Sequence, residues 1–213
     1  NQMAAMPIHP RLARFMIEAR RFGIMNDAAI AVAVLSERDP LKGIPMNANA
    51  IHQCDLSEKV EKLKSLFADP DSHHHKSPAI RNAKRIAEQI QTSTPRHGTT
   101  HSQRDSNTDP DYPLQRALLT AYPDRVARRR DDEPRRGVLV GGRGVRQSKH
   151  STALQGEFFL CIDVDSQDRE AIVHSGIPLE GDRVAASCLR LDTSRRLWST
   201  LLHLGLDLGP AHG

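Results

Sequence analysis

Apolar residues recur at helical spacing in four stretches before residue 91, covering about 10–24, 26–35, 55–67 and 77–90. The second stretch is apolar on every side from Ala28 to Leu35, which is typical of a helix at the centre of a bundle. Asn26 is a candidate N-cap for it, and Asp55 and Glu58 have capping-box spacing at the start of the third. The pattern predicts an N-terminal helical bundle.

A polar segment and one more helix follow these four stretches in the prediction. Residues 91–111 are almost entirely polar and predict a linker or a long surface insertion. Leu114 and Leu118 then recur at helical spacing, with Asp111 as a candidate cap and Pro113 suited to the first turn. We expect a helix over 112–130 that completes the bundle, kinked or ended by Pro123.

After the last helix the apolar pattern changes from helical to alternating. Glycines flank Val138–Val140, which indicates a buried strand followed by a turn with positive φ. Alternation over 158–164 and apolar runs at 171–173 and 184–191 predict further strands. Helices followed by segregated strands define the α+β class. The expected domains are a bundle over 1–90, a linker over 91–111, the completing helix over 112–130, a β module over 131–191 and an unassigned tail over 192–213.

Charge is concentrated in the middle of the chain. Between Pro113 and Arg146 nine arginines stand against four acidic residues, a local balance of +5, whereas the whole chain carries only +4. Such a patch is the electrostatic signature of a protein that binds phosphate backbones. If the chain is helical there, Arg125, Arg128 and Arg129 share one face. The alternative is a solvated hinge whose arginines pair with the neighbouring acids.

Composition narrows the remaining possibilities. The chain has 213 residues, of which 38% are hydrophobic and 4% aromatic, so its core must be aliphatic and modest. Three distant cysteines without a CxxC pattern favour a reducing cytoplasm over a disulfide framework or a zinc site. No segment has the pattern of a membrane span or a signal peptide, so no membrane partner is expected. Because the first residue is Asn1, we expect a piece of a longer protein.

Motifs for nucleotide chemistry are incomplete. Gly137 and Gly142 have the spacing of a phosphate-binding loop, but Arg143 and Gly144 stand where lysine and Ser/Thr are required. No Ser/His/Asp arrangement can be assigned from sequence alone. We therefore predict no catalytic residue and no bound cofactor in this chain.

Two clusters of potential metal ligands lack the residues that a complete metal site requires. Adjacent His73–His75 cannot all face one metal, and no cysteine or carboxylate is placed to complete the shell. Asp163, Asp165 and Asp168 lack the glycine and the terminal glutamate of a calcium loop. We predict no metal site.

Several segments, in matching order and spacing, resemble bacterial HrpB-type ATP-dependent helicases of the DEAH/RHA group. They are MAAMPIHPRLARFMIEA at 3–19, AVAVLSERDPL at 31–41, PLQRALLTAYPDRVARRR at 113–130, GVLVGGRGVR at 137–146, GEFFLCIDVD at 156–165 and, more weakly, IRNAKRIAEQI at 80–90. The similarity covers about residues 1–190 and ends after Leu191. It implies a helicase-associated helical domain followed by an OB-like module, downstream of two RecA-like motor domains that bind ATP and magnesium.

The resemblance also implies a function and partners. The chain lacks a Walker A motif and a DEAH box, so it is expected to be an accessory nucleic-acid-binding region of an RNA helicase without ATPase activity of its own. Its expected partners are single-stranded RNA or DNA and the motor domains of the same parent chain. The alternative is a scaffold that docks on a motor or an acidic protein. Tyr122, Phe158 and Phe159 are the nearby candidates for base stacking. The expected contacts to nucleic acid are Arg125, Arg128, Arg129, Arg130, Arg135, Arg136, Arg143 and Arg146.

Overall fold

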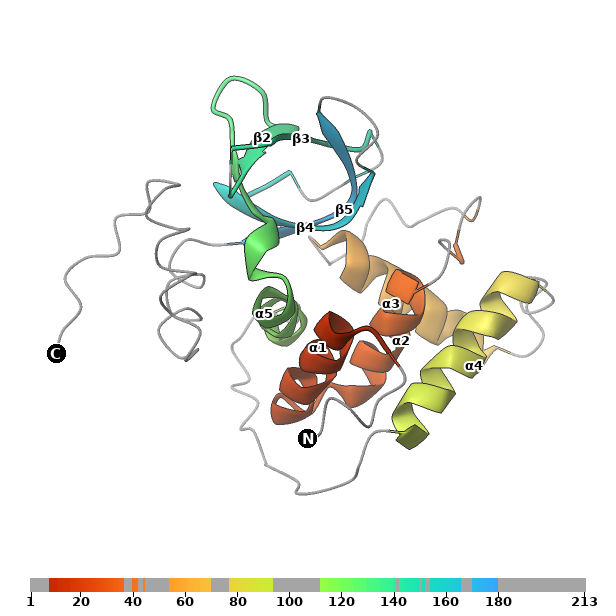
Figure 1. Cartoon of the computed structure of the whole chain (residues 1–213). Helices are drawn as coiled ribbons and strands as arrows, with labels where there is room; N and C mark the ends of the chain where they lie inside the picture. The colour runs from red at the N-terminus through yellow and green to blue at the C-terminus, as the bar shows by residue number, and fades with distance from the viewer. Residues whose placement is uncertain are drawn as a thin grey trace, which may run out of the picture. The chain divides into compact units, whose positions relative to one another are not determined.

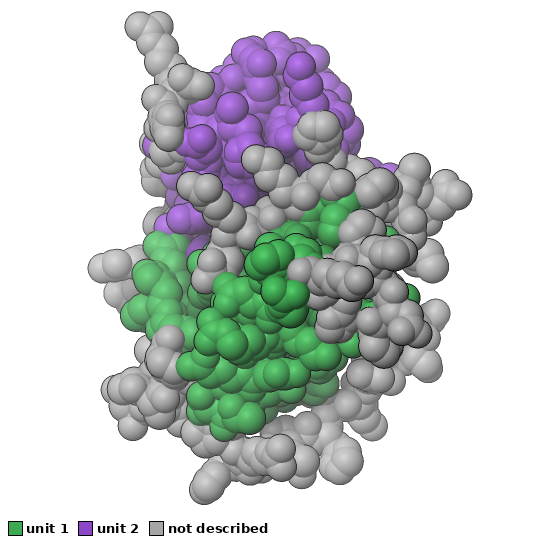
Figure 2. All heavy atoms as spheres, turned by 90° about the vertical axis from the view of Figure 1, so that its right-hand side faces the viewer, with its two compact units in different colours: residues 1–52, 56–121 green, residues 53–55, 122–213 purple. Residues whose placement is uncertain are grey.

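The computed structural model describes residues 8–36, 40–41, 44, 54–69, 77–93, 112–140, 142–149, 151, 154–165 and 170–179. The chain divides into two compact units, coloured separately in Figure 2. The first comprises 1–52 and 56–121, and the second comprises 53–55 and 122–213. The described α-helices fall in the first unit, apart from Asp55 at the start of one of them, and the described strands fall in the second, so the predicted α+β class is confirmed.

The first unit contains the α-helices of the described residues. They are α1 (Pro10–Arg21), α2 (Met25–Ser36), α3 (Asp55–Ala68), α4 (Pro78–Ser93) and α5 (Tyr112–Ala121), and Figure 1 labels each of them. Helix α2 packs against α4, and α1 packs against both α5 and α2. Phe15 and Met16 of α1 are fully buried, and so is nearly every residue of α2 from Ala28 to Val34. The all-round apolar pattern of α2 thus reflects a central position.

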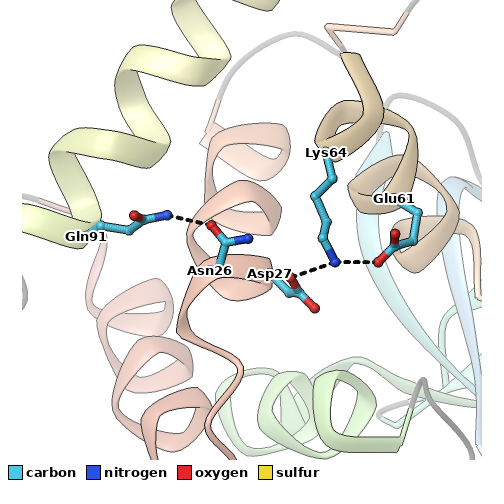
Figure 3. Close-up of polar contacts among 5 residues, drawn as sticks. All are labelled: Asn26, Asp27, Glu61, Lys64 and Gln91. Atoms are coloured by element: carbon cyan, nitrogen blue, oxygen red, sulfur yellow. Dashed lines mark hydrogen bonds and ion pairs between the residues drawn. The ribbon is translucent and has the colours of Figure 1, made fainter. Parts of the chain in front are cut away.

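Polar contacts join α2 to two neighbouring helices (Figure 3). The Gln91 side chain of α4 donates to Oδ1 of Asn26 over 2.9 Å, and Nζ of Lys64 on α3 lies 3.1 Å from Oδ1 of Asp27. Lys64 also pairs with Glu61 at 2.6 Å. Burial lowers the pKa of Lys64, but its bonds to the two carboxylates outweigh burial and raise that pKa overall. Asn26 lies inside α2, which begins at Met25, so the prediction of an N-cap was wrong.

Helix boundaries differ from the sequence prediction in two places. Helix α4 continues to Ser93, so residues 91–93 belong to a helix rather than to the predicted linker. Helix α5 ends at Ala121, and the predicted helix over 112–130 is therefore too long. Pro123 is the physical reason, because its ring and its missing N–H cannot continue the α5 hydrogen-bond ladder. It begins instead the short 3₁₀ helix η3 (Pro123–Arg125).

Five strands in the described part of the second unit form a closed barrel. They are β1 (Val126–Arg129), β2 (Arg136–Leu139), β3 (Gly144–Gln147), β4 (Phe158–Asp165) and β5 (Ala171–Leu179). The strand order is β1-β2-β3-β5-β4, with β4 pairing back to β1, and Figure 1 shows the resulting ring. Among these described strands, β3 and β5 pair in parallel and the other pairs are antiparallel. Closure pairs each of the five described strands on both sides, which removes the free edges at which sheets pair with other chains.

Alternate residues of the strands fill the barrel interior. Ala127, Val145, Phe159, Cys161, Ala171 and Val173 form one buried apolar cluster. Gly137 of β2 allows the Phe159 ring to lie close, because a Cβ at this position would meet ring carbons at 2.7 Å and 2.8 Å. Gly142, between β2 and β3, has φ of +86°, which confirms the predicted turn with positive φ.

The first residue of α3 is bonded inside the second unit. Oδ2 of Asp55 accepts from the Ser151 hydroxyl over 2.6 Å and from the Gly176 amide over 2.9 Å. Asp55 is 6% exposed, and these donors satisfy a carboxylate that would otherwise be costly to bury. The capping-box spacing predicted the start of α3 to within a residue, but Asp55 is the first helical residue rather than the residue before it, and its carboxylate accepts hydrogen bonds from the barrel unit.

Several predictions fall on residues outside the described ranges. They include most of the 91–111 linker, the strand candidate at 184–191, the 192–213 tail, His73–His75 and Asp168. Among the residues that the structure describes, no helix has the length and apolar content of a membrane span. The described residues also contain no group of three or more His, Cys, Asp or Glu side chains arranged to hold a metal ion.

Candidate nucleic-acid interface

The eight arginines predicted to contact nucleic acid lie in η3, in β1–β3 and in the loops between those strands. Arg128 and Arg129 occupy consecutive positions of strand β1, so they do not share the helical face expected for them. Because side chains alternate along a strand, neighbouring arginines point to opposite sides of the barrel wall. The structure therefore separates the cluster into inward and outward members.

Arg129 is the inward member, on the same side of β1 as the fully buried Ala127. Its guanidinium donates to Oε1 of Gln147 over 2.8 Å and to the carbonyls of Gly156 and Gln155 over 2.9 Å and 3.1 Å. It also bonds the Pro134 carbonyl and lies 4.8 Å from the centre of the Phe159 ring. All three of its nitrogens thus bind groups of the barrel itself.

Burial has electrostatic consequences inside the barrel. It lowers the pKa of Arg129, although the nearby Cys161 acts in the opposite direction. Burial also raises the pKa of the Cys161 thiol to about 12, despite the opposing effect of Arg125 and Arg129. At neutral pH this cysteine is a thiol rather than a thiolate, so it serves as a packing residue and not as a nucleophile.

Arg125 and Arg135 also donate to backbone carbonyls of the barrel unit. Nη1 of Arg125 donates to the Ile162 carbonyl over 2.6 Å, and its guanidinium lies 5.4 Å from the centre of the Tyr122 ring. Nη1 of Arg135 donates to the Ser148 carbonyl over 2.8 Å and more weakly to that of Ser151. Both side chains are half-buried; Arg125 joins η3 to β4, and Arg135 joins the β1–β2 loop to the segment after β3.

Arg128, Arg136 and Arg146 are the outward members, and we call them the outer arginine face. Arg136 stands opposite Arg146 across β2 and β3, and Arg128 stands opposite Val138, two residues further along β2 from Arg136. Period-two alternation therefore puts all three on the outer surface of β1–β3. Arg128 and Arg146 are 44% and 50% exposed, and Arg136 is 29% exposed.

Carboxylates accompany each member of the outer arginine face. Nε of Arg128 lies 3.0 Å from Glu157, and Nη1 of Arg136 lies 2.9 Å from Glu133. Glu170 lies 3.2 Å from Nε of both Arg136 and Arg146, one oxygen to each. Glu157 and Glu170 lie outside the 113–146 window, so the local charge of +5 overstated the net charge of this surface.

The two remaining arginines lie on loops next to this surface. Arg130 is exposed at the start of the loop that joins β1 to β2, and its amide donates to the Arg136 carbonyl over 2.9 Å. Arg143 is exposed in the β2–β3 turn, where its carbonyl accepts from the Leu139 amide. Arg143 therefore adds positive charge beyond the strands, whereas Arg130 shares its loop with the exposed acids Asp131, Asp132 and Glu133.

Aromatic side chains are not available on this surface within the described residues. Tyr122, Phe158 and Phe159 are 8%, 1% and 0% exposed, so none of the predicted stacking candidates can receive a base without rearrangement. Ile172 of β5 is the exposed large apolar side chain among the described residues. It stands opposite Arg146 across the parallel β3–β5 pair. The surface offers cations and aliphatic groups rather than rings.

Comparison with known proteins gives similarity at the level of structure. No family model matches the chain, and no curated protein matches it in sequence. Among solved structures, it is similar in fold to part of a DExH-box NTPase. That protein is E. coli HrpB, which aligns with a TM-score of 0.54 and 20% identity over 89% of this chain. The chain covers 19% of the length of HrpB. At this identity the match establishes a shared fold, in agreement with the family resemblance of the sequence.

Proposed function

We propose that this chain is an accessory region of an ATP-dependent helicase and holds single-stranded nucleic acid by its phosphates. The observation that carries the proposal is the fold shared with part of the DExH-box NTPase HrpB over 89% of this chain. In this proposal the five described helices are a helicase-associated bundle that docks on RecA-like motor domains of the same parent chain. Those motor domains, with ATP and magnesium, supply the energy for movement.

The barrel supports assignment as an OB-like module. It has five strands in the order β1-β2-β3-β5-β4 and closes through β1 and β4. OB folds are five-stranded Greek-key barrels that bind oligonucleotides on the face of strands 2 and 3 and on adjoining loops. The outer arginine face lies on those strands and on β1, with Arg130 and Arg143 on adjoining loops. Position in the barrel and the gathering of arginine side chains thus favour the same surface.

The contacts proposed here are made to phosphates rather than to bases. Arginine side chains pair with phosphate oxygens and carry no sequence information by doing so. The buried state of Tyr122, Phe158 and Phe159 removes the usual stacking platform of single-strand binding proteins. A surface of this kind holds any sequence and permits movement of the strand, which suits a region beside a translocating motor.

Neutralising two outward arginines should weaken single-strand binding and reduce its dependence on salt. On single strands each lost phosphate contact lowers the log–log salt slope by roughly 0.7, so the double variant Arg128→Gln/Arg146→Gln should lose roughly 0.7 to 1.4, the larger value if each arginine holds a phosphate of its own. The loss should be similar for homopolymers of different base. Fluorescence titration of labelled oligonucleotides at several salt concentrations measures both quantities.

Arg81→Gln/Arg85→Gln is the matched control for this experiment. Both arginines are exposed on α4, so their replacement removes the same two charges from a surface outside the barrel unit. The control should bind like the unmodified chain. An unchanged slope for the double variant, with normal folding, would contradict the nucleic-acid assignment and would favour docking on an acidic protein.

A second experiment addresses catalysis. The chain carries no Walker A motif and no DEAH box, so purified residues 1–213 should hydrolyse ATP only at the buffer background, with or without RNA. A coupled phosphate-release assay across the final purification step measures this. Turnover that co-elutes with the protein would show that nucleotide chemistry resides in this chain, contrary to the proposal.

A further inference from the structure

Arg136 and Arg146 face each other directly across the antiparallel β2–β3 pair. Like charges at opposed positions of neighbouring strands repel each other and destabilise the sheet. Glu170, just before β5, offsets this repulsion: its Oε1 lies 3.2 Å from Nε of Arg136, and its Oε2 lies 3.2 Å from Nε of Arg146. One carboxylate is therefore divided between two guanidinium groups.

This arrangement fits an anion with two oxygens on one central atom. A phosphodiester presents two non-bridging oxygens in a similar way, and arginine pairs well with both carboxylates and phosphates. Nε of Arg136 is buried and has no hydrogen-bond partner among the described residues, although Oε1 of Glu170 lies within ion-pair distance. The carboxylate thus balances the charge of Arg136 without satisfying this donor.

We propose that Arg136 and Arg146 form one phosphate site, in which the Glu170 carboxylate stands in for a backbone phosphate until nucleic acid displaces it. The inference rests on the proposed function, because it concerns the same outer arginine face. It adds that two of the three outward arginines serve a single phosphate, and that the chain carries its own competitor for that phosphate.

The competitor gives the site a way to release its ligand. Glu170 is attached to the barrel next to β5, so its effective concentration at the two arginines is high and constant. The net binding free energy of a phosphate is then only the difference between its own interaction with the two arginines and that of the Glu170 carboxylate. Because Glu170 returns when a phosphate leaves, the carboxylate shared by the two arginines is restored, in addition to the Glu133 carboxylate that pairs with Arg136. Weak and rapidly exchanging contact is what a strand in motion requires.

Replacing the competitor should strengthen binding. We expect Glu170→Gln to tighten single-strand affinity by roughly three- to tenfold, the size expected for releasing two part-exposed ion pairs. The gain should disappear in the double variant Glu170→Gln/Arg146→Gln, because the second arginine of the site is then missing. The binding titrations described above measure both values, and thermal melts on the same samples confirm folding.

Glu157→Gln separates displacement at this site from a general loss of negative charge. Glu157 pairs with Arg128, belongs to the same surface and is 54% exposed, whereas Glu170 is 27% exposed and lies between two arginines. Its replacement should tighten binding by less than about twofold. An equal gain from both variants, or a Glu170→Gln gain that survives Arg146→Gln, would overturn the inference.

A probe without nucleic acid distinguishes failure of this inference from failure of the proposed function. Inorganic phosphate, titrated into the ¹⁵N-labelled full chain, should shift the Nε–Hε resonances of Arg136 and Arg146 more strongly in Glu170→Gln than in the unmodified protein. If phosphate acts in this way but oligonucleotides do not bind, the site exists and the helicase assignment fails. If oligonucleotides bind but phosphate moves neither resonance in either protein, the paired site is refuted.

Discussion

Replacement of Arg129 by methionine should lower the free energy of unfolding of the barrel unit by roughly 2–4 kcal/mol. The change removes a charged donor from the carbonyls of Gly156, Gln155 and Pro134 and from Gln147. It also removes the cation that lies 4.8 Å from the Phe159 ring. Urea unfolding monitored through amide hydrogen exchange in β1 and β4 measures the stability of the barrel separately from that of the helices.

Arg128→Met is the matched control for this prediction. It removes the same charge from the next position of the same strand, where the side chain is exposed and paired with Glu157. Exposed ion pairs contribute about 0–1 kcal/mol, so its effect on unfolding should be correspondingly small. Equal destabilisation by the two variants would contradict the structural role assigned to Arg129. The control should also weaken RNA binding, because Arg128 belongs to the outer arginine face.

Gly137→Ala should destabilise the barrel unit by about 2 kcal/mol, within the usual range for overpacking a core. The added Cβ would stand 2.7 Å from the Arg128 carbonyl oxygen and equally close to the Phe159 ring. Neither group can move easily, since the first is backbone of the paired strand and the second is a fully buried side chain. Thermal and urea unfolding of the purified variant test this value.

Gly144→Ala provides the comparison within the same hairpin. A Cβ at Gly144 would meet only the Glu170 side chain, at 3.7 Å and 3.8 Å, which is ordinary van der Waals contact. This variant should change stability by less than about 0.5 kcal/mol, as surface substitutions usually do. If both alanines are tolerated, the close approach of β2 to the Phe159 ring is not required for the barrel.

Helices were the part of the fold that local pattern predicted best. The apolar stripe of α1 and the uniformly apolar α2 are properties of consecutive residues, and burial follows directly from them. Helix ends were less well predicted. The helix expected through Arg130 stops at Ala121, because Pro123 breaks the ladder and pairing with β2 and β4 draws the following residues into a strand.

The candidate interface shows a different limit of sequence reasoning. The local excess of arginine was visible in the chain, but its division between inside and outside was not. Once residues 126–129 form a strand, period-two alternation turns Arg129 inward and Arg128 outward. If this segment were helical, the side chains of Arg128 and Arg129 would lie on one face.

The sequence by itself determined the α+β class, the four described helices before residue 94 and the concentration of arginine in one segment, because each depends on neighbouring residues. Only the tertiary structure decided which arginines are exposed and which carboxylates accompany them. Closure of the barrel brings Glu157 and Glu170 to β1–β3 from beyond the basic segment, and it brings Asp55 to Ser151 and Gly176 from much earlier in the chain. Such pairs are far apart in sequence, so no local pattern of residues reveals them.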